Sequence, residues 1–133
     1  LLEAIVYASR SANKAVNEID HISFCESVPE WNAEGTVLNE EMVLITQSLK
    51  EVQSVMNNYV GIVRSDLRLK RAFDRLGLLY RETEALYVKS VLSPKLCELR
   101  NVISVAYLII KMAMARKESL GLHFSIDYPI KEE

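Results

Sequence analysis

The feature that most constrains this chain is the apolar periodicity that follows Ser93. Ser93 is a favourable N-cap, and Pro94 stands at the first helical position, where its missing N–H costs nothing. Behind them, apolar side chains recur with alternating spacings of three and four residues: Leu96, Leu99, Ile103, Ala106, Ile110 and Ala113. This spacing is typical of a bundled helix, and it predicts a long helix that ends near Gly121.

A second apolar stripe lies beside the first on the same predicted helix: Val102, Val105, Ile109 and Met112. Two stripes predict that this helix is covered on more than one side. The helix predicted for residues 1–19 has a face of small residues, Ala8, Ala12 and Ala15, which would permit a close approach. We therefore expect this first helix, or a domain outside the chain, to cover the second stripe.

Two further stripes predict the other helices of a bundle. One follows Asn39, the expected N-cap, and comprises Met42, Ile45, Leu49, Val52, Met56 and Tyr59. The other follows Ser65, extends to about Ser90, and comprises Leu69, Phe73, Leu76, Tyr80, Thr83 and Tyr87. The link between these helices is short, which favours antiparallel neighbours.

The sequence therefore predicts an all-α fold, an antiparallel three-helix bundle that resembles a spectrin repeat. The bundle is expected over residues 39–119, with an additional N-terminal helix at 1–19, a loop at 20–38 and an extended C-terminal tail at 120–133. A chain of 133 residues, half of them hydrophobic, suits a single helical domain over 1–133.

Charge and cysteine content exclude several classes of protein. The net charge of −2 gives no general attraction to nucleic acid or to an anionic membrane. The longest apolar run, residues 105–110, is far shorter than the roughly 20 residues of a membrane span. Cys25 and Cys97 are too few for a disulfide scaffold. No nucleic-acid or membrane partner is expected.

The sequence offers no complete catalytic or metal site. It has no Gly-rich phosphate loop after a strand and no recognisable Ser–His–Asp or Cys–His arrangement. His21 and Cys25 are too few for a metal site, and His123 after a helix end is more typical of capping or packing. A basic stretch from Arg64 to Arg75 is expected to be a solvated face or a docking surface for acidic groups of another domain.

Several short segments, in order, carry a family resemblance. They are Glu98-Leu99-Arg100-Asn101, the run from Val105 to Ile109, Ala115-Arg116-Lys117-Glu118-Ser119, Gly121-Leu122-His123 and Asp127-Tyr128-Pro129. Residues 59–64 and 1–12 add two more matching segments. Together they resemble the C-terminal helical domain of the L-aspartate oxidases, within the succinate dehydrogenase and fumarate reductase flavoprotein family. Leu120 departs from the family, which usually has Arg there.

The resemblance implies a cytoplasmic FAD-dependent oxidoreductase in which this chain is one domain. Such an enzyme oxidises L-aspartate to iminoaspartate, passes electrons to oxygen or fumarate, and supplies quinolinate and NAD biosynthesis. The catalytic residues would lie upstream, so none is expected in this chain, which starts without Met inside a helical pattern. The partners would be the flavin-binding and substrate-capping domains of the same polypeptide.

One residue has an implied cofactor role. By residue match, the backbone N–H of Leu1 would neighbour the flavin of the full-length enzyme; the isolated chain is expected to bind no FAD and to catalyse nothing. Two alternatives remain open at this point. The chain could be the same domain of a succinate dehydrogenase or fumarate reductase flavoprotein, or a stand-alone helical adaptor.

Overall fold

The computed structural model describes residues 2–130 and divides the chain into two compact units, Leu1–Asn32 and Ala33–Glu133. The first unit contains the helix α1 (Leu2–Glu18), followed by a 3₁₀ turn at Ile19–His21. All of its described residues are exposed, so this unit has no core of its own. The expected docking of α1 on the helix that follows Ser93 concerns both units and stays a prediction.

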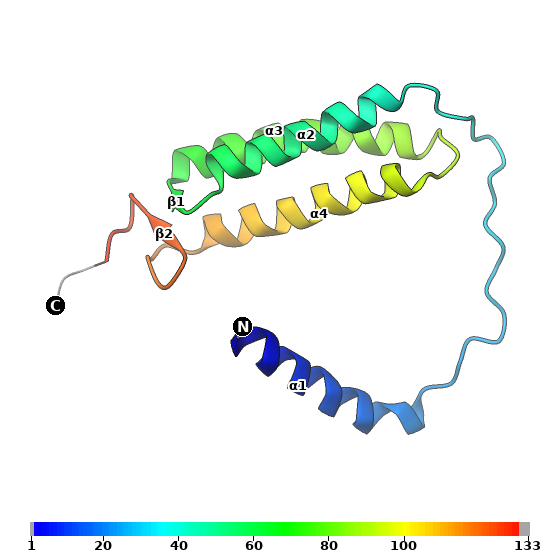
Figure 1. Cartoon of the computed structure of the whole chain (residues 1–133), viewed down its shortest axis with the longest axis horizontal. Helices are drawn as coiled ribbons and strands as arrows, with labels where there is room; N and C mark the ends of the chain where they lie inside the picture. The colour runs from blue at the N-terminus through cyan, green and yellow to red at the C-terminus, as the bar shows by residue number, and fades with distance from the viewer. Residues whose placement is uncertain (1, 131–133) are drawn as a thin grey trace. The chain divides into compact units, whose positions relative to one another are not determined.

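The second unit is an antiparallel three-helix bundle, as the sequence predicts. Its helices are α2 (Met42–Tyr59), α3 (Asp66–Tyr87) and α4 (Pro94–Ala115), and each packs against the other two. Figure 1 shows the three helices side by side, with the chain reversing its direction between α2 and α3 and again between α3 and α4. The all-α fold class is therefore confirmed.

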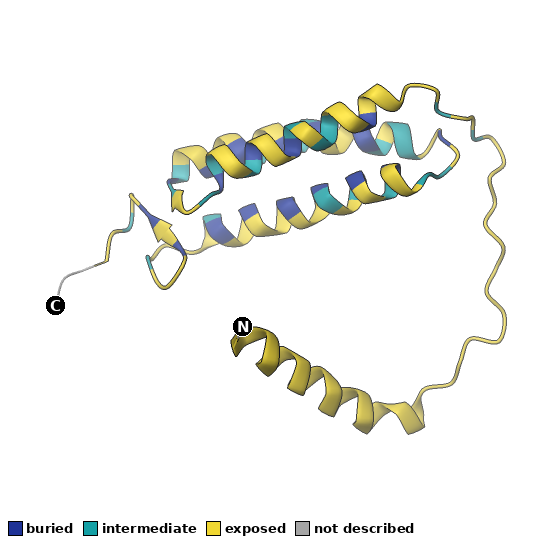
Figure 2. Ribbon diagram, viewed as in Figure 1, coloured by how far each residue is buried: buried dark blue, intermediate teal, exposed yellow. Residues whose placement is uncertain are grey.

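The buried residues lie on the facing sides of the three helices (Figure 2). The first stripe of α4 is buried throughout: Leu96, Leu99, Ile103, Ala106, Ile110 and Ala113. From α2 the core takes Ile45, Val52 and Val55, and from α3 it takes Leu69, Ala72, Leu76 and Leu79. Tyr80 was expected in this core, but its position lies at the edge of the α3 face and its side chain is 47% exposed.

The predicted N-cap residue is confirmed for two of the three bundle helices. The hydroxyls of Ser65 and Ser93 accept hydrogen bonds from the N–H groups of Arg68 (3.2 Å) and Leu96 (3.3 Å). Asn39 is not the cap of α2; its side chain instead accepts from the N–H of Glu41 at 3.0 Å, which forms a turn before the helix.

The end of α4 differs from the prediction. The helix stops at Ala115, and Arg116 is already extended (φ −89°, ψ 106°), so Gly121 does not end it. Gly121 has φ +60° and lies in a tight turn, where the backbones of Leu120 and His123 exchange hydrogen bonds of 2.9 and 3.2 Å. A glycine suits this turn because left-handed backbone is costly for residues with a Cβ.

The described part of the predicted tail, residues 120–130, contains a short strand and a turn and is not simply extended. Its strand β2 (Phe124–Ser125) pairs in parallel with β1 (Val63–Arg64), which precedes α3. The register pairs Val63 with Phe124 and Arg64 with Ser125. This small sheet brings the tail back to the start of α3, where α2 also ends (Figure 1).

Candidate functional site

The residue with a predicted cofactor role lies outside the structural description. Leu1 is outside the described residues, so the prediction for its backbone N–H is not tested. The described helix α1 begins next to it, with the carboxylate of Glu3 in its first turn. Around His21 and Cys25, and elsewhere in residues 2–130, no three His, Cys, Asp or Glu side chains are grouped to hold a metal ion.

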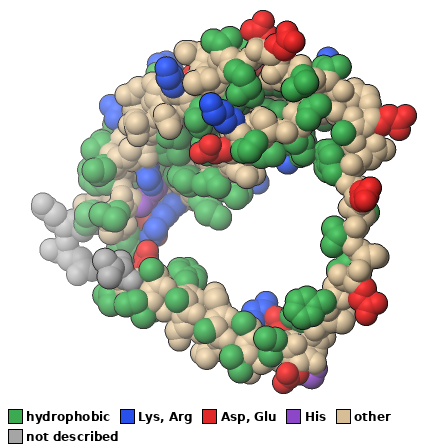
Figure 3. Space-filling view, turned by 45° about the vertical axis from the view of Figure 1, so that its right-hand side comes forward, with side chains coloured by type: hydrophobic (Ala, Val, Ile, Leu, Met, Phe, Trp, Pro, Cys, Tyr) green, Lys and Arg blue, Asp and Glu red, His purple; other side chains and the backbone are tan. Residues whose placement is uncertain are grey.

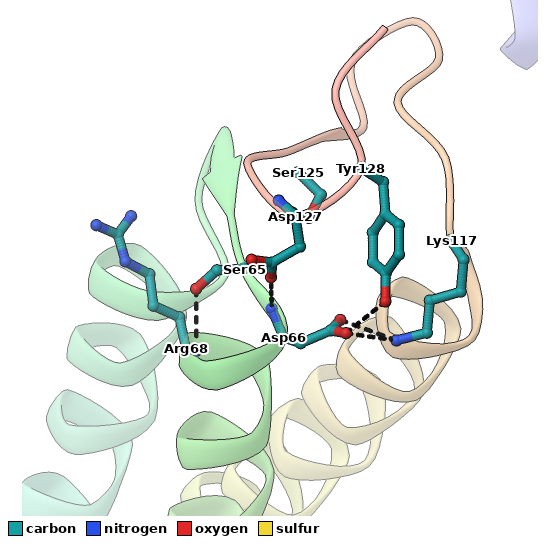
Figure 4. A network of polar contacts seen from close by, with 7 residues as sticks. All are labelled: Ser65, Asp66, Arg68, Lys117, Ser125, Asp127 and Tyr128. Carbon is teal, nitrogen blue, oxygen red and sulfur yellow. Dashed lines mark hydrogen bonds and ion pairs between the residues drawn. The ribbon is translucent and has the colours of Figure 1, made fainter. Parts of the chain in front are cut away.

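The most connected polar group of the second unit joins the tail to the start of α3. We call it the C-terminal clamp, formed by Asp66, Lys117, Ser119, Ser125, Asp127 and Tyr128. Lys117 Nζ donates to both carboxylate oxygens of Asp66, at 2.8 and 2.9 Å, and Tyr128 Oη donates to one of them at 2.6 Å (Figure 4). The Lys117 ammonium also lies 5.1 Å from the centre of the Tyr128 ring, within cation–π range.

These contacts shift the pKa values of both charged partners, Asp66 and Lys117. The hydrogen bond from Lys117, and then that from Tyr128, hold the pKa of the Asp66 carboxyl below its ordinary value. In return, the hydrogen bond to Asp66 raises the pKa of Lys117 above its ordinary value. The pair is therefore charged at neutral pH, and it joins the second residue after α4 to the start of α3.

Backbone groups complete the C-terminal clamp. The N–H of Asp66 donates to the Asp127 carboxylate at 2.6 Å, which places negative charge at the start of α3, where the helix dipole favours it. The Ser119 hydroxyl accepts from the N–H of Ser125 at 2.9 Å and donates to the carbonyl of Tyr128 at 2.6 Å. These groups are engaged in holding the tail, which indicates a structural role.

A second contact holds the tail beside the C-terminal clamp. Arg64 Nε donates to the carbonyls of Val60 (3.2 Å) and Gly61 (2.9 Å) at the end of α2, and its Nη1 lies 2.8 Å from His123 Nδ1. Because a guanidinium only donates, Nδ1 accepts, and the ring proton lies on Nε2. His123 is buried, and Nε2 has no partner among residues 2–130. The contact agrees with a packing role for His123.

The residue that departs from the family pattern has no side-chain role here. Leu120 is 61% exposed, although its backbone is paired with that of His123 in the Gly121 turn.

Most of the second apolar stripe of α4 is not covered within the bundle; only Val102 is partly buried against the core. Val105, Ile109 and Met112 are 56%, 43% and 69% exposed, so the bundle alone leaves them open. Their expected cover, the first helix or a domain outside the chain, stays a prediction. Figure 3 shows hydrophobic side chains at the surface of the bundle, between the charged ones. The physical reason is that two partners, α2 and α3, cover only one broad face of α4.

Two apolar grooves border this surface. The α3–α4 groove is lined by Leu76, Gly77, Tyr80, Ile103, Ser104, Tyr107 and Leu108. The α2–α4 groove is lined mainly by Val52, Met56, Asn57, Val102, Val105 and Ile109. Concave apolar surfaces of this kind suit the docking of another protein segment.

The basic stretch is less available than the sequence suggests. Lys70 pairs with Asp74, Arg75 pairs with Glu51, and Arg68 Nη1 donates to the carbonyl of Val63 at 3.2 Å. Arg71 has no charged partner among the residues that the structure describes. Most of the predicted acid-docking face is therefore used within the bundle.

No helix within the described part of the chain combines the length and the apolar character needed to cross a membrane.

Comparison with known proteins gives consistent matches. The model of the fumarate reductase flavoprotein C-terminal family matches residues 49–133. The L-aspartate oxidase of Vibrio cholerae is 39% identical over 97% of this chain, and that of Pseudomonas aeruginosa is 42% identical over 97%. The chain covers 24% of each, so it spans about a quarter of the length of these relatives.

A solved structure is also similar. A chain of the Mycobacterium smegmatis Sdh1 complex in the apo form matches 90% of this chain, with a TM-score of 0.52 and 25% identity. The match covers 19% of that larger chain. Both kinds of comparison therefore relate this chain to one part of a longer protein.

Proposed function

Because the chain belongs to the fumarate reductase flavoprotein C-terminal family, we propose that it is the C-terminal helical domain of an FAD-dependent L-aspartate oxidase. The observation that supports this choice within the family is the 39–42% identity to proteins of that name over 97% or more of the chain. The full-length protein is the enzyme in this proposal, and this chain alone is not.

The proposed reaction is the oxidation of L-aspartate to iminoaspartate in the cytoplasm. FAD would supply the redox chemistry, with oxygen or fumarate as the final acceptor, and the product would enter quinolinate and NAD biosynthesis. The substrate-binding and proton-transferring residues would belong to the flavin-binding and substrate-capping domains of the same polypeptide.

The residues described here do not by themselves fit a whole FAD molecule. Phosphate groups need a cradle of backbone N–H groups, such as a Gly-rich loop between strand and helix. Within residues 2–130, the backbone N–H groups at the start of α1 are the candidate contact, and the carboxylate of Glu3 lies in the same turn. We therefore limit the proposed cofactor contact of this chain to backbone N–H groups at that start, with Leu1 as the proposed neighbour.

The proposed role of the bundle is to pack on the flavin-binding domain and to support it. The exposed apolar residues of α4 and the two grooves beside it are suited to this role, because burying apolar surface drives association. The C-terminal clamp holds residues 124–128 against the start of α3.

The test is a substrate comparison on the full-length protein that carries this chain. The purified protein is expected to show flavin absorbance and to release hydrogen peroxide, or reduce fumarate, when L-aspartate is added. Succinate is the comparison substrate. Oxidation of succinate without oxidation of L-aspartate would reject the proposed function.

The second candidate function is that of a succinate dehydrogenase or fumarate reductase flavoprotein, which the similarity to the Mycobacterium smegmatis chain favours. The same substrate comparison separates it from the oxidase. A stand-alone adaptor is separated by the coding sequence that precedes Leu1. A Gly-x-Gly-x-x-Gly segment after a first strand there would exclude the adaptor.

A further inference from the structure

The α3–α4 groove has features that the packing of the bundle does not require. Its walls include Tyr80, Tyr107 and Leu108, whose side chains are 47%, 38% and 50% exposed. The rings of Phe73 and Tyr107 are in contact at one side, with their centres 5.4 Å apart. This contact holds the Tyr107 ring in place as one wall of the groove. The groove is therefore a shaped apolar surface that no described residue fills.

The floor of this groove contains a glycine inside a helix. Gly77 lies in the middle of α3, where glycine is unfavourable compared with alanine. A Cβ built on Gly77 would come no nearer than 4.0 Å to another side chain, the Nη1 of Arg81. The bundle thus has room for a larger residue here, so its own packing does not explain the glycine.

The groove is bordered by cations that have no carboxylate partner. Lys111 lies over the ring of Tyr107, with Nζ 5.7 Å from its centre, and Arg81 lies beside Gly77. Neither forms an ion pair with any residue in the described range 2–130. The nearby acids Asp74 and Glu84 are already paired with Lys70 and Arg100.

We propose that the α3–α4 groove is the docking surface for an acidic apolar segment of the flavin-binding domain, with Gly77 leaving room for close approach. This inference rests on the proposed function, because it takes the occupant from the same polypeptide. The apolar part of the segment packs between Tyr80 and Tyr107, and its carboxylates pair with Arg81 and Lys111. The α2–α4 groove lacks this match, since its polar lining is formed by the amides of Gln53, Asn57 and Asn101.

The first experiment measures whether the groove is covered in the full-length protein. Ser104, which lines the groove and is exposed here, is replaced in the variant Ser104→Cys, and the control is Gln47→Cys at an exposed position of α2. Alkylation at each site is followed by peptide mass spectrometry. We expect Ser104→Cys to react about tenfold or more slowly than the control, and equally fast in denaturant. Equal native rates would overturn the proposal.

The second experiment tests the charge of the occupant. In the full-length Ser104→Cys protein, Arg81→Glu with Lys111→Glu is expected to raise the alkylation rate close to that of the control site. The matched control, Lys50→Glu with Lys95→Glu, changes the same amount of charge at exposed positions away from the groove and should leave protection unchanged. Protection that survives the Arg81 and Lys111 reversal would overturn an acidic occupant.

Two further outcomes are decisive. Protection that disappears on dilution would assign the groove to a second copy of the protein, and so would overturn the proposal. Failure of this inference is distinguishable from failure of the proposed function, because the latter is read from the substrates oxidised. An active L-aspartate oxidase with an open groove would reject only the inference.

Discussion

At the scale of single residues, Ser119 holds the tail through one hydroxyl. That hydroxyl accepts from the Ser125 N–H and donates to the Tyr128 carbonyl, and the contacts are partly buried. Removing it leaves both backbone groups without this partner. Ser119→Ala is therefore expected to lower the free energy of unfolding by about 1–3 kcal/mol, measured by urea denaturation.

Ser104→Ala is the matched control for this prediction. Its hydroxyl is exposed and donates to the carbonyl of Arg100 within the same helix. The control is expected to change the free energy of unfolding by less than about 0.5 kcal/mol. Equal effects of the two substitutions would show that the tail is not held through Ser119.

Gly77 gives a prediction of opposite sign. A methyl group at this position meets no close neighbour, and it reduces the conformational freedom of the unfolded chain. Gly77→Ala is expected to raise the free energy of unfolding of the bundle by about 0.5–1 kcal/mol, seen as a higher melting temperature. A lower melting temperature would mean that the bundle itself needs glycine here.

At the scale of elements, α4 supplies more buried residues to the core than α2 or α3. Ile103 is 1% exposed, and a carboxylate at this position would be buried without a partner. Ile103→Asp is expected to destabilise the bundle by about 4 kcal/mol or more, measured by thermal or urea unfolding. The control Ser104→Asp, at the next and exposed position, should retain a cooperative transition; similar losses in both would reject the core register.

The contact between the tail and α3 should depend on pH. The pKa of Asp66 is lowered in the folded protein, so its contribution to stability is complete above the unfolded aspartate value of about 3.9. The contribution is lost as the pH falls through the lower folded pKa. The pKa of Lys117 is raised, so its contribution is lost only as the pH rises above the unfolded lysine value of about 10.4.

Asp66→Asn tests this pH dependence. Urea unfolding midpoints of the parent are expected to fall more steeply on acidification below about pH 4 than those of the variant. Asp74→Asn is the control, because Asp74 forms an exposed i,i+4 pair with Lys70 that contributes little. Parallel curves for the parent and Asp66→Asn would contradict the role of the Asp66 contacts.

At the scale of the whole molecule, we expect the rest of the proposed enzyme, and not this chain alone, to hold the flavin. The chain spans about a quarter of its relatives, and its described residues lack a phosphate cradle. Purified residues 1–133 are expected to be strongly helical by circular dichroism and to retain no flavin absorbance, whereas the full-length protein retains it. Flavin that stays with the isolated chain through gel filtration would contradict this prediction.

Local patterns were sufficient to predict the bundle. The spacing of apolar residues in α4 fixes which side of that helix is buried, because residues three and four apart share one face. The N-caps Ser65 and Ser93 were predictable for the same reason, since a cap bonds to an N–H only three residues away. The segments that resemble the L-aspartate oxidases could be recognised because each is contiguous in the sequence.

The contacts that hold the tail, and the grooves between the helices, join residues far apart in the sequence, so no local pattern predicts them. Asp66 and Lys117 are 51 residues apart, and Arg64 and His123 are 59 apart, so their pairing follows from the antiparallel passage of the chain. The same contacts explain the early end of α4, since Lys117 and Ser119 bond to α3 and to the tail instead of continuing the helix. The sequence by itself determined the helices and their buried faces. Only the tertiary structure decided where the tail binds and which groove stays open, because both require side chains from different helices to meet.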